Sequence, residues 1–246
     1  MALRIGQLNF KARDAAALGR FWAAALDWEI FSERPGATAV GPAGFTWPDP
    51  VVVSLDFIAV TDPPAVADRV HLDLGTTSLA HQAALVERLE SLGAVPADVG
   101  QRDVPWTVLA DPEGNVFCVL EPREVYQDTG PIAAIVVDCA SPRVLASFWQ
   151  SATGWTVREV NDDYAGLRSP GGGPWLEFLR TSDPRVRNHI HLDLVPSPGQ
   201  EAEVARLRTL GASDADVGQG DVPWRVLTDP EGNQFCVLGP HVLGPH

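Results

Sequence analysis

The chain has 246 residues, of which 45% are hydrophobic and 20% charged, a composition typical of globular proteins with one or two domains. Its 18 basic and 32 acidic residues give a net charge of −14, which argues against nucleic acid or an anionic membrane surface as a partner. Three cysteines are too few for a disulfide framework in a chain of this length. With no signal-peptide pattern and no long apolar run, we predict a cytoplasmic protein.

The first 60 residues predict one strand, one helix and three further strands. The first strand covers residues 3–10, and Asp14 is placed to cap the helix that follows. Helical spacing is shown by Leu18, Phe21, Trp22, Ala25 and Leu26. Short extended segments are then expected around 27–33, 36–42 and 51–59.

The next 60 residues predict the same order of elements. A strand at 69–75 precedes a helix with Leu79, Val86, Leu89 and Leu92 on one stripe and Gly93 just after its end. Extended segments follow around 95–100, 105–110 and 115–120. The last two are joined by Asp111-Pro112-Glu113-Gly114-Asn115, whose proline and glycine predict a tight hairpin turn. Each round therefore reads βαβββ.

The whole pattern then occurs again. Residues 98–120 and 216–238 are identical at 19 of 23 positions, and the segment His71-Leu72-Asp73-Leu74 returns as His191-Leu192-Asp193-Leu194. We predict two similar domains, residues 1–122 and 130–240, with a linker over 121–130. Each domain is expected to pair its own two βαβββ modules.

Several residues could carry chemistry. His71 and Asp73 share one strand face, as do His191 and Asp193, because neighbours two apart on a strand point the same way. Each histidine is either a metal ligand or acid–base group oriented by its aspartate, or a hydrogen-bonded histidine in a half-buried sheet. No catalytic residue can be assigned from the sequence.

Two acidic residues and two tryptophans are candidates for ligand binding. Asp56 and Glu177 lie in otherwise apolar strands, where a carboxylate needs a partner, a ligand or solvent. Trp106 and Trp224 each follow a Val-Pro pair, and they either line a ligand cavity or pack in the core. Cys118 and Cys236, in Phe-Cys-Val-Leu segments, are expected to pack as small buried side chains unless they bind metal.

These motifs resemble the vicinal oxygen chelate superfamily. The resemblance is carried by Phe-Trp-x-x-x-Leu-x-Trp, His-Leu-Asp-Leu, Leu-Gly-Ala and Asp-Pro-Glu-Gly-Asn-x-Phe-Cys-Val, and it covers nearly the whole chain twice. The superfamily includes glyoxalase I, bleomycin-resistance proteins and extradiol dioxygenases. The resemblance implies an α+β fold of the glyoxalase/bleomycin resistance/dioxygenase type, with four βαβββ modules paired into two half-open barrels.

The resemblance also implies positions for metal ligands. In the first repeat these are Gln7, Asp56, His71 and Cys118, which we expect in one cavity. In the second repeat the matching residues are Ala134, Glu177, His191 and Cys236, of which the last three could bind metal in a second cavity. Cysteine stands where glyoxalase I has a glutamate base, which argues against that reaction; the ligand set of extradiol dioxygenases is missing too.

Two functions remain open. The first is a metal-free protein that binds a small molecule, as bleomycin-resistance proteins sequester theirs, and we expect no cofactor in this case. The alternative is a lyase, isomerase or group-transfer enzyme that uses zinc, nickel, manganese or iron on a substrate with adjacent oxygens. In either case we predict a monomer or a weak homodimer.

Overall fold

The computed structural model describes residues 3–61, 69–182, 189–196 and 199–239. It contains four βαβββ modules in chain order. Module 1 comprises β1 (Arg4–Ala12), α1 (Ala15–Leu26), β2 (Glu29–Arg34), β3 (Ala37–Gly41) and β4 (Ser54–Ala59). Module 2 comprises β5 (Val70–Leu74), α2 (Leu79–Ser91), β6 (Val95–Pro96), β7 (Thr107–Ala110) and β8 (Val116–Val119).

The second repeat supplies the other two modules after a linker that contains the 3-10 turn η1 (Glu124–Tyr126). Module 3 comprises β9 (Ile132–Cys139), α3 (Pro142–Thr153), β10 (Thr156–Val160), β11 (Tyr164–Arg168) and β12 (Trp175–Arg180). Module 4 comprises β13 (Ile190–Val195), α4 (Gln200–Thr209), β14 (Ser213–Asp214), β15 (Arg225–Thr228) and β16 (Gln234–Val237).

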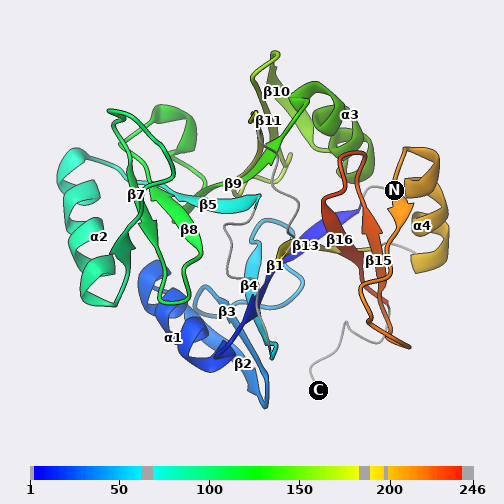
Figure 1. Cartoon of the computed structure of the whole chain (residues 1–246), viewed down its shortest axis with the longest axis horizontal. Coiled ribbons are helices and arrows are strands. Elements are labelled where there is room, and N and C mark those ends of the chain that lie inside the picture. Colours follow the sequence, from blue (N-terminus) through cyan, green and yellow to red (C-terminus); the bar gives the residue numbers. More distant parts are fainter. Residues whose placement is uncertain (1–2, 62–68, 183–188, 197–198, 240–246) are drawn as a thin grey trace.

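The four modules form two mixed sheets of eight strands, and each sheet takes one module from each repeat (Figure 1). Sheet A has the order β14-β15-β16-β13-β1-β4-β3-β2, and sheet B the order β10-β11-β12-β9-β5-β8-β7-β6. The seams are antiparallel pairs, β1 with β13 and β5 with β9. The α+β architecture of four modules in two open sheets is confirmed, whereas the prediction that each repeat pairs its own modules is wrong.

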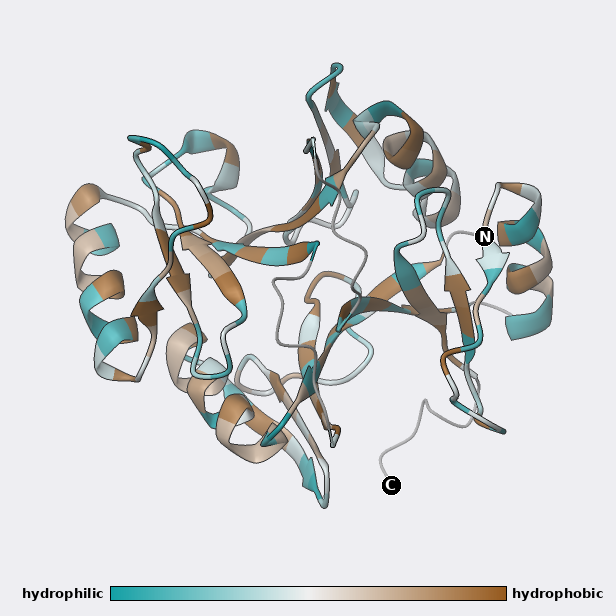
Figure 2. Cartoon of the chain, viewed as in Figure 1, coloured by the Kyte–Doolittle hydropathy of each residue, from teal (hydrophilic) through white to brown (hydrophobic). Residues whose placement is uncertain are grey.

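The helices and the helix-facing sides of both sheets share one apolar core. It brings together large buried side chains of α1, α3 and both sheets: Phe10, Trp22, Phe57, Phe117, Phe148, Trp149 and Phe235. Figure 2 shows the hydrophobic colours concentrated on the strands, with hydrophilic colours on turns and outward helix faces. Among the described helices, none has both the length and the apolarity needed to cross a membrane.

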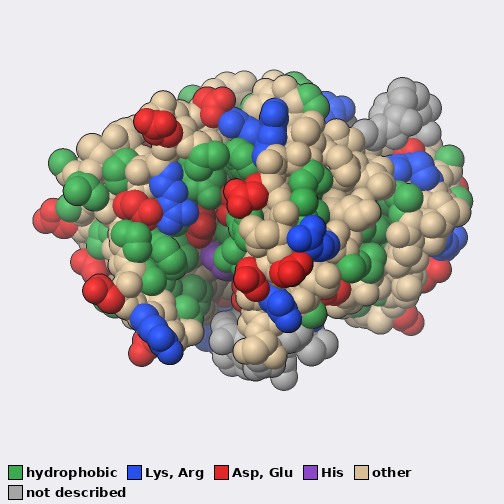
Figure 3. Space-filling model, turned by 90° about the horizontal axis from the view of Figure 1, so that it is seen from above, with side chains coloured by type: hydrophobic (Ala, Val, Ile, Leu, Met, Phe, Trp, Pro, Cys, Tyr) green, Lys and Arg blue, Asp and Glu red, His purple; other side chains and the backbone are tan. Residues whose placement is uncertain are grey.

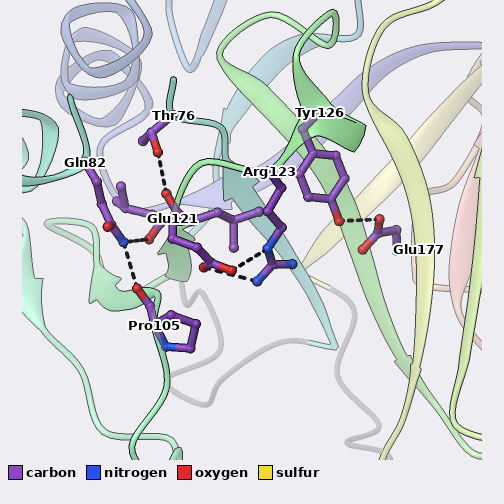
Figure 4. Close-up of polar contacts among 9 residues, drawn as sticks. Thr76, Gln82, Pro105, Glu121, Arg123, Tyr126 and Glu177 are labelled. Carbon is purple, nitrogen blue, oxygen red and sulfur yellow. Dashed lines mark hydrogen bonds and ion pairs between the residues drawn. The ribbon is translucent and has the colours of Figure 1, made fainter. Parts of the chain in front are cut away.

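The helix predictions hold at the caps and fail at two apolar positions of α2 and its C-cap. Asp14 caps α1 by accepting a hydrogen bond from the Ala17 backbone N–H, and Gly93 follows α2 with φ +109°. The expected stripe of α2 is wrong at Leu79, which is 68% exposed, and at Leu92, which is 37% exposed. Gln82 turns inward instead, because its amide donates to the Pro105 and Val119 carbonyls (Figure 4).

The predicted hairpin turn also stabilises a neighbouring module. The Asp111 N–H donates to the Asn115 carbonyl, and Gly114 has φ +90°, which confirms the turn. Asp111 also accepts a hydrogen bond from the Trp22 indole of α1 at 3.1 Å. Glu113 accepts from the backbone N–H groups of Arg13 and Asp14. Residues 229–233 contact the start of α3 and Trp149 in the same way. The repeated turn therefore has a structural role.

Candidate functional site

A cavity of about 260 Å³ opens on the face of sheet A that points away from the helices. Its apolar walls are Ile58, Val60, Val217, Trp224, Val226 and Leu238. Its polar lining includes Gln7, Asn9, Asp56, His191, Asp193 and Cys236, and Lys11 and Arg34 bring positive charge. The side chains come from strands of both repeats, so the swapped pairing of modules creates the cavity.

The strand register brings the polar groups together. Gln7 of β1 lies opposite Asp193 of β13, and Asn9 lies opposite His191 and beside Asp56 of β4. The Gln7 amide donates to Asp193 Oδ2 at 2.8 Å and to Asp56 Oδ2 at 3.2 Å. The Asn9 amide donates to the same Asp56 oxygen at 3.3 Å. The neutral Gln7 amide thus bridges the two carboxylates, and the Asn9 amide adds a second donor to Asp56.

Burial shifts the pKa values of two groups in the sheet A cavity. Burial, followed by the nearby charge of Asp193, raises the pKa of Asp56 to about 7. Asp56 can therefore gain or lose a proton near neutral pH at the cavity wall. Burial also raises the pKa of the Cys236 thiol far above its usual range, with Asp193 adding to the effect. Without a metal, Cys236 is a neutral thiol rather than a nucleophilic thiolate.

The matching face of sheet B is covered by the linker (Figure 4). Tyr126 of η1 is 9% exposed and packs among Val108, Cys118, Leu120, Ala134, Val136 and Trp175. Its hydroxyl donates to Glu177 Oε1 at 2.7 Å, and the Tyr164 hydroxyl donates to the same oxygen at 2.9 Å. Arg123, paired with Glu121, lies over the rings of Trp106 and Tyr126. This face is filled by the protein's own side chains.

Burial also raises the pKa values of two carboxyl groups on sheet B. Burial, then the charge of Glu177, raises the pKa of Asp73 to about 7. Burial also raises the pKa of Glu177, although the two phenols that donate to it oppose the shift. Burial raises the pKa of the Cys118 thiol in the same way as that of Cys236. On both sheets the cysteine is a buried thiol, as the sequence predicted.

The predicted metal ligands are grouped by sheet in the structure, and not by repeat as the sequence predicted. Gln7 and Asp56 share the sheet A cavity with His191 and Cys236 rather than with His71 and Cys118. His71 and Cys118 lie on sheet B. Glu177 is on the same sheet, separated from His71 and Cys118 by β9. The prediction of one cavity per repeat is therefore wrong, because β1 pairs with β13 and β9 with β5.

Each sheet holds a trio of side chains that could bind one metal ion. His191, Asp193 and Cys236 form one trio, and His71, Asp73 and Cys118 form the other, with ligand atoms all within 4.8 Å of one another. Histidine, carboxylate and thiolate suit zinc and similar ions. In the first trio, Asp193 Oδ1 and His191 Nδ1 are buried without a hydrogen-bond partner. The donors therefore fit a divalent ion, which would have to displace the thiol proton.

Sequence reasoning missed several of these residues. It assigned Asp73 and Asp193 only an orienting role, although both belong to the trios. Asn9 alternates with Gln7 along β1, and that period of two was a usable signal. Tyr126 and Tyr164 could not be found in this way, because their contact with Glu177 depends on how the linker and β11 lie on the sheet.

The two candidate tryptophans occupy equivalent positions with different surroundings. Trp224 lines the sheet A cavity. Trp106 lies under the Arg123 guanidinium, whose central carbon is 5.6 Å from the ring centroid. Neither ring is among the fully buried residues of the core. Trp224 therefore faces the sheet A cavity, whereas Trp106 borders a separate surface hollow beside α2.

Acidic and basic side chains mix over the face of the molecule seen in Figure 3, with no continuous basic patch on that face. This agrees with the net charge of −14.

Comparisons with known proteins agree with this architecture. The sequence model of the glyoxalase-like domain matches residues 7–120 and 134–238. A search of curated proteins finds no match. Glyoxalase I from Zea mays has a similar structure, with a TM-score of 0.67 at 13% identity over 100% of this chain and 98% of that chain. A putative dioxygenase from Bacillus subtilis gives 0.62 at 13% identity, covering 97% and 85%. These similarities concern the fold.

Proposed function

This chain belongs to the glyoxalase-like domain family, and on that premise we propose that it binds a small molecule in the sheet A cavity. One observation carries the proposal: the cavity combines apolar walls with convergent polar groups, as small-molecule sites do. Trp224 supplies a flat wall, and Asp56 supplies a hydrogen-bond acceptor on the opposite strands. If the protein only sequesters the molecule without changing it, no catalytic residue is needed in addition to these binding groups.

Sheet A is preferred over sheet B because the linker already fills the second face. Trp106 and Glu177 are the sheet B equivalents of Trp224 and Asp56. Arg123 lies over the Trp106 ring, and the Tyr126 hydroxyl donates to Glu177. A ligand on sheet B would have to displace the buried Tyr126 side chain, which is hydrogen-bonded and packed against Trp175. The expected stoichiometry is therefore one small molecule per chain.

The test combines ligand identification with a matched pair of variants. Small molecules are extracted from purified protein, identified by mass spectrometry and titrated back by calorimetry. Trp224→Ala is expected to weaken binding by tenfold or more, whereas Trp106→Ala leaves the affinity within a factor of two. Equal weakening by both variants, or an effect confined to Trp106→Ala, would contradict a site on sheet A.

A second function is favoured by the metal-binding trios. A divalent ion held by His191, Asp193 and Cys236 would supply Lewis acidity toward a substrate with adjacent oxygens, as in a lyase, isomerase or group-transfer enzyme. Asp56, whose carboxylate lies on the cavity wall beside Gln7 and Asn9, would exchange a proton with such a substrate.

Elemental analysis of protein purified without chelator separates the two functions. About one divalent ion per chain that is lost in His191→Ala and retained in His71→Ala would establish the metal site on sheet A. Ligand binding that persists unchanged after dialysis against EDTA would support the metal-free function instead.

A further inference from the structure

The two sheets can be compared position by position. Across the seams, Gln7 and Asn9 of β1 face Asp193 and His191, while Ala134 and Val136 of β9 face Asp73 and His71. On the other side, Asp56 lies beside Asn9 just as Glu177 lies beside Val136. Asp56 and Glu177 therefore hold the same place on their sheets.

Two of the large side chains that fill sheet B have small counterparts on sheet A. Trp175 pairs with Ala134, and its counterpart beside Gln7 is Ser54. Tyr164 pairs with Leu179, and its counterpart beside Ile58 is Ala37. On sheet B, Gly166 makes room for a phenol, because a Cβ there would lie 2.5 Å from the Tyr164 hydroxyl.

The space occupied by Tyr126 on sheet B matches the cavity of sheet A. Tyr126 packs against Val108, Cys118 and Leu120 of module 2. The corresponding residues of module 4, at a constant offset in sequence, are Val226, Cys236 and Leu238, and all three line the cavity. An internal phenol ring thus packs on sheet B against residues whose counterparts line the cavity of sheet A, where the partly buried Trp47 packs against their cluster and leaves the cavity open beside it.

The contacts of Tyr126 show how this position on sheet B holds a phenol ring and its hydroxyl group. Its ring meets Trp175 edge to face, with centroids 6.2 Å apart, and its hydroxyl donates to the buried Glu177 carboxyl. In sheet A the equivalent carboxyl, Asp56, accepts both amide hydrogen bonds at Oδ2. No hydrogen bond to Asp56 Oδ1 is found within the described part of the chain, so this oxygen can accept one from a ligand.

We infer that the sheet A cavity binds a hydroxylated aromatic compound, with its ring beside Val226 and Leu238 and its hydroxyl donating to Asp56, as Tyr126 does to Glu177. The inference rests on the proposed function and specifies its ligand class. The volume is sufficient, because apolar cavities of about 150 Å³ already hold benzene, and this one measures about 260 Å³.

The test compares two probes that differ in one hydroxyl group, p-cresol and toluene. Each is titrated into the full chain by calorimetry and by ligand-observed NMR. We expect p-cresol to bind at least tenfold more tightly than toluene, the factor that corresponds to about 1.4 kcal/mol at 25 °C. Asp56→Asn should remove this preference. Asp163→Asn, which removes one charge from an aspartate whose side chain is 84% exposed, should retain it.

The outcomes separate the inference from the proposed function. If both probes bind equally and Trp224→Ala weakens both, the cavity is a small-molecule site, but the hydroxyl preference is wrong. If p-cresol does not bind up to its solubility while an extracted compound without an aromatic hydroxyl group binds in a Trp224-dependent manner, the ligand class is wrong and the site stands. A preference that survives in Asp56→Asn also overturns the inference, since circular dichroism can establish that the variant is folded.

Discussion

Removing the two phenol hydroxyls beside Glu177 tests whether the linker is bound to sheet B as described. Tyr126→Phe and Tyr164→Phe each delete one donor to the same oxygen, at 2.7 and 2.9 Å, from a carboxyl that is 4% exposed. Hydrogen bonds to charged groups contribute about 1.5–3 kcal/mol. We expect each single variant to lose an amount near the lower end, because one donor remains.

The double variant should lose more than the sum of the two. With both phenols absent, Glu177 is a buried carboxyl with no donor at Oε1, and leaving such a group unsatisfied costs about 1–3 kcal/mol or more. A coupling of about 1 kcal/mol or larger is therefore expected in a double-mutant cycle. The coupling should be greater at pH 8 than at pH 5, because burial raises the pKa of Glu177 and protonation weakens its need for donors.

The assay is urea unfolding of the four proteins, followed by tryptophan fluorescence and by circular dichroism. Coincident transitions would establish two-state behaviour for the cycle. Strict additivity of the two variants would refute the shared acceptor. An unchanged stability of Tyr126→Phe, together with a large loss in Tyr126→Ala, would show that the phenol only fills space, and this would also weaken the comparison with the sheet A cavity.

Three further outcomes are expected. First, Asp73→Asn should gain stability relative to the parent as pH rises from about 4 to 8 in EDTA, measured by thermal melts. Burial raises the pKa of Asp73 from 3.8 to about 7, so the stability that the protonated Asp73 contributes is fully present below pH 4 and is lost as the pH rises through 7. A difference in melting temperature between variant and parent that does not change with pH would contradict this. Second, Trp22→Phe should cost about 1–3 kcal/mol in urea unfolding, because it removes a buried donor to Asp111. Third, residues 1–122 expressed alone should self-associate, because β1 and β5 lose their partner strands β13 and β9; a folded monomer by light scattering would disprove it.

Local features of the fold were predictable from sequence because they depend on neighbouring residues. The Asp14 cap, the turn at Gly114 and the positions of the main strands all follow from capping, turn and alternation rules. By contrast, the stripe of α2 failed at Leu79, because an inward hydrogen-bonding Gln82 is not visible as a hydrophobic signal.

The pairing of modules could not be predicted for a physical reason. The strands β5 and β13 carry nearly the same residues, Val-His-Leu-Asp-Leu and Ile-His-Leu-Asp-Leu, and so present the same faces to a partner. Alternation of apolar and polar residues therefore fits β1 to either strand equally well. The alternation pattern does not encode long-range contacts such as those that the Glu113 carboxylate makes at the start of α1. Consequently, the residue types of the site were predictable, but their grouping was not.

Several residue differences between the repeats explain why the face of sheet A is open and the equivalent face of sheet B is filled. The His-x-Asp pair and the cysteine are present on both sheets and cannot explain why only one face is open. Sheet A has Gln7 where sheet B has Ala134, which adds a polar group, and Ser54 where sheet B has Trp175, which leaves free space. The linker then completes sheet B with a phenol that is hydrogen-bonded to Glu177. Duplication thus allows one face to add buried contacts to the fold, while the equivalent face keeps a carboxylate acceptor and an open cavity.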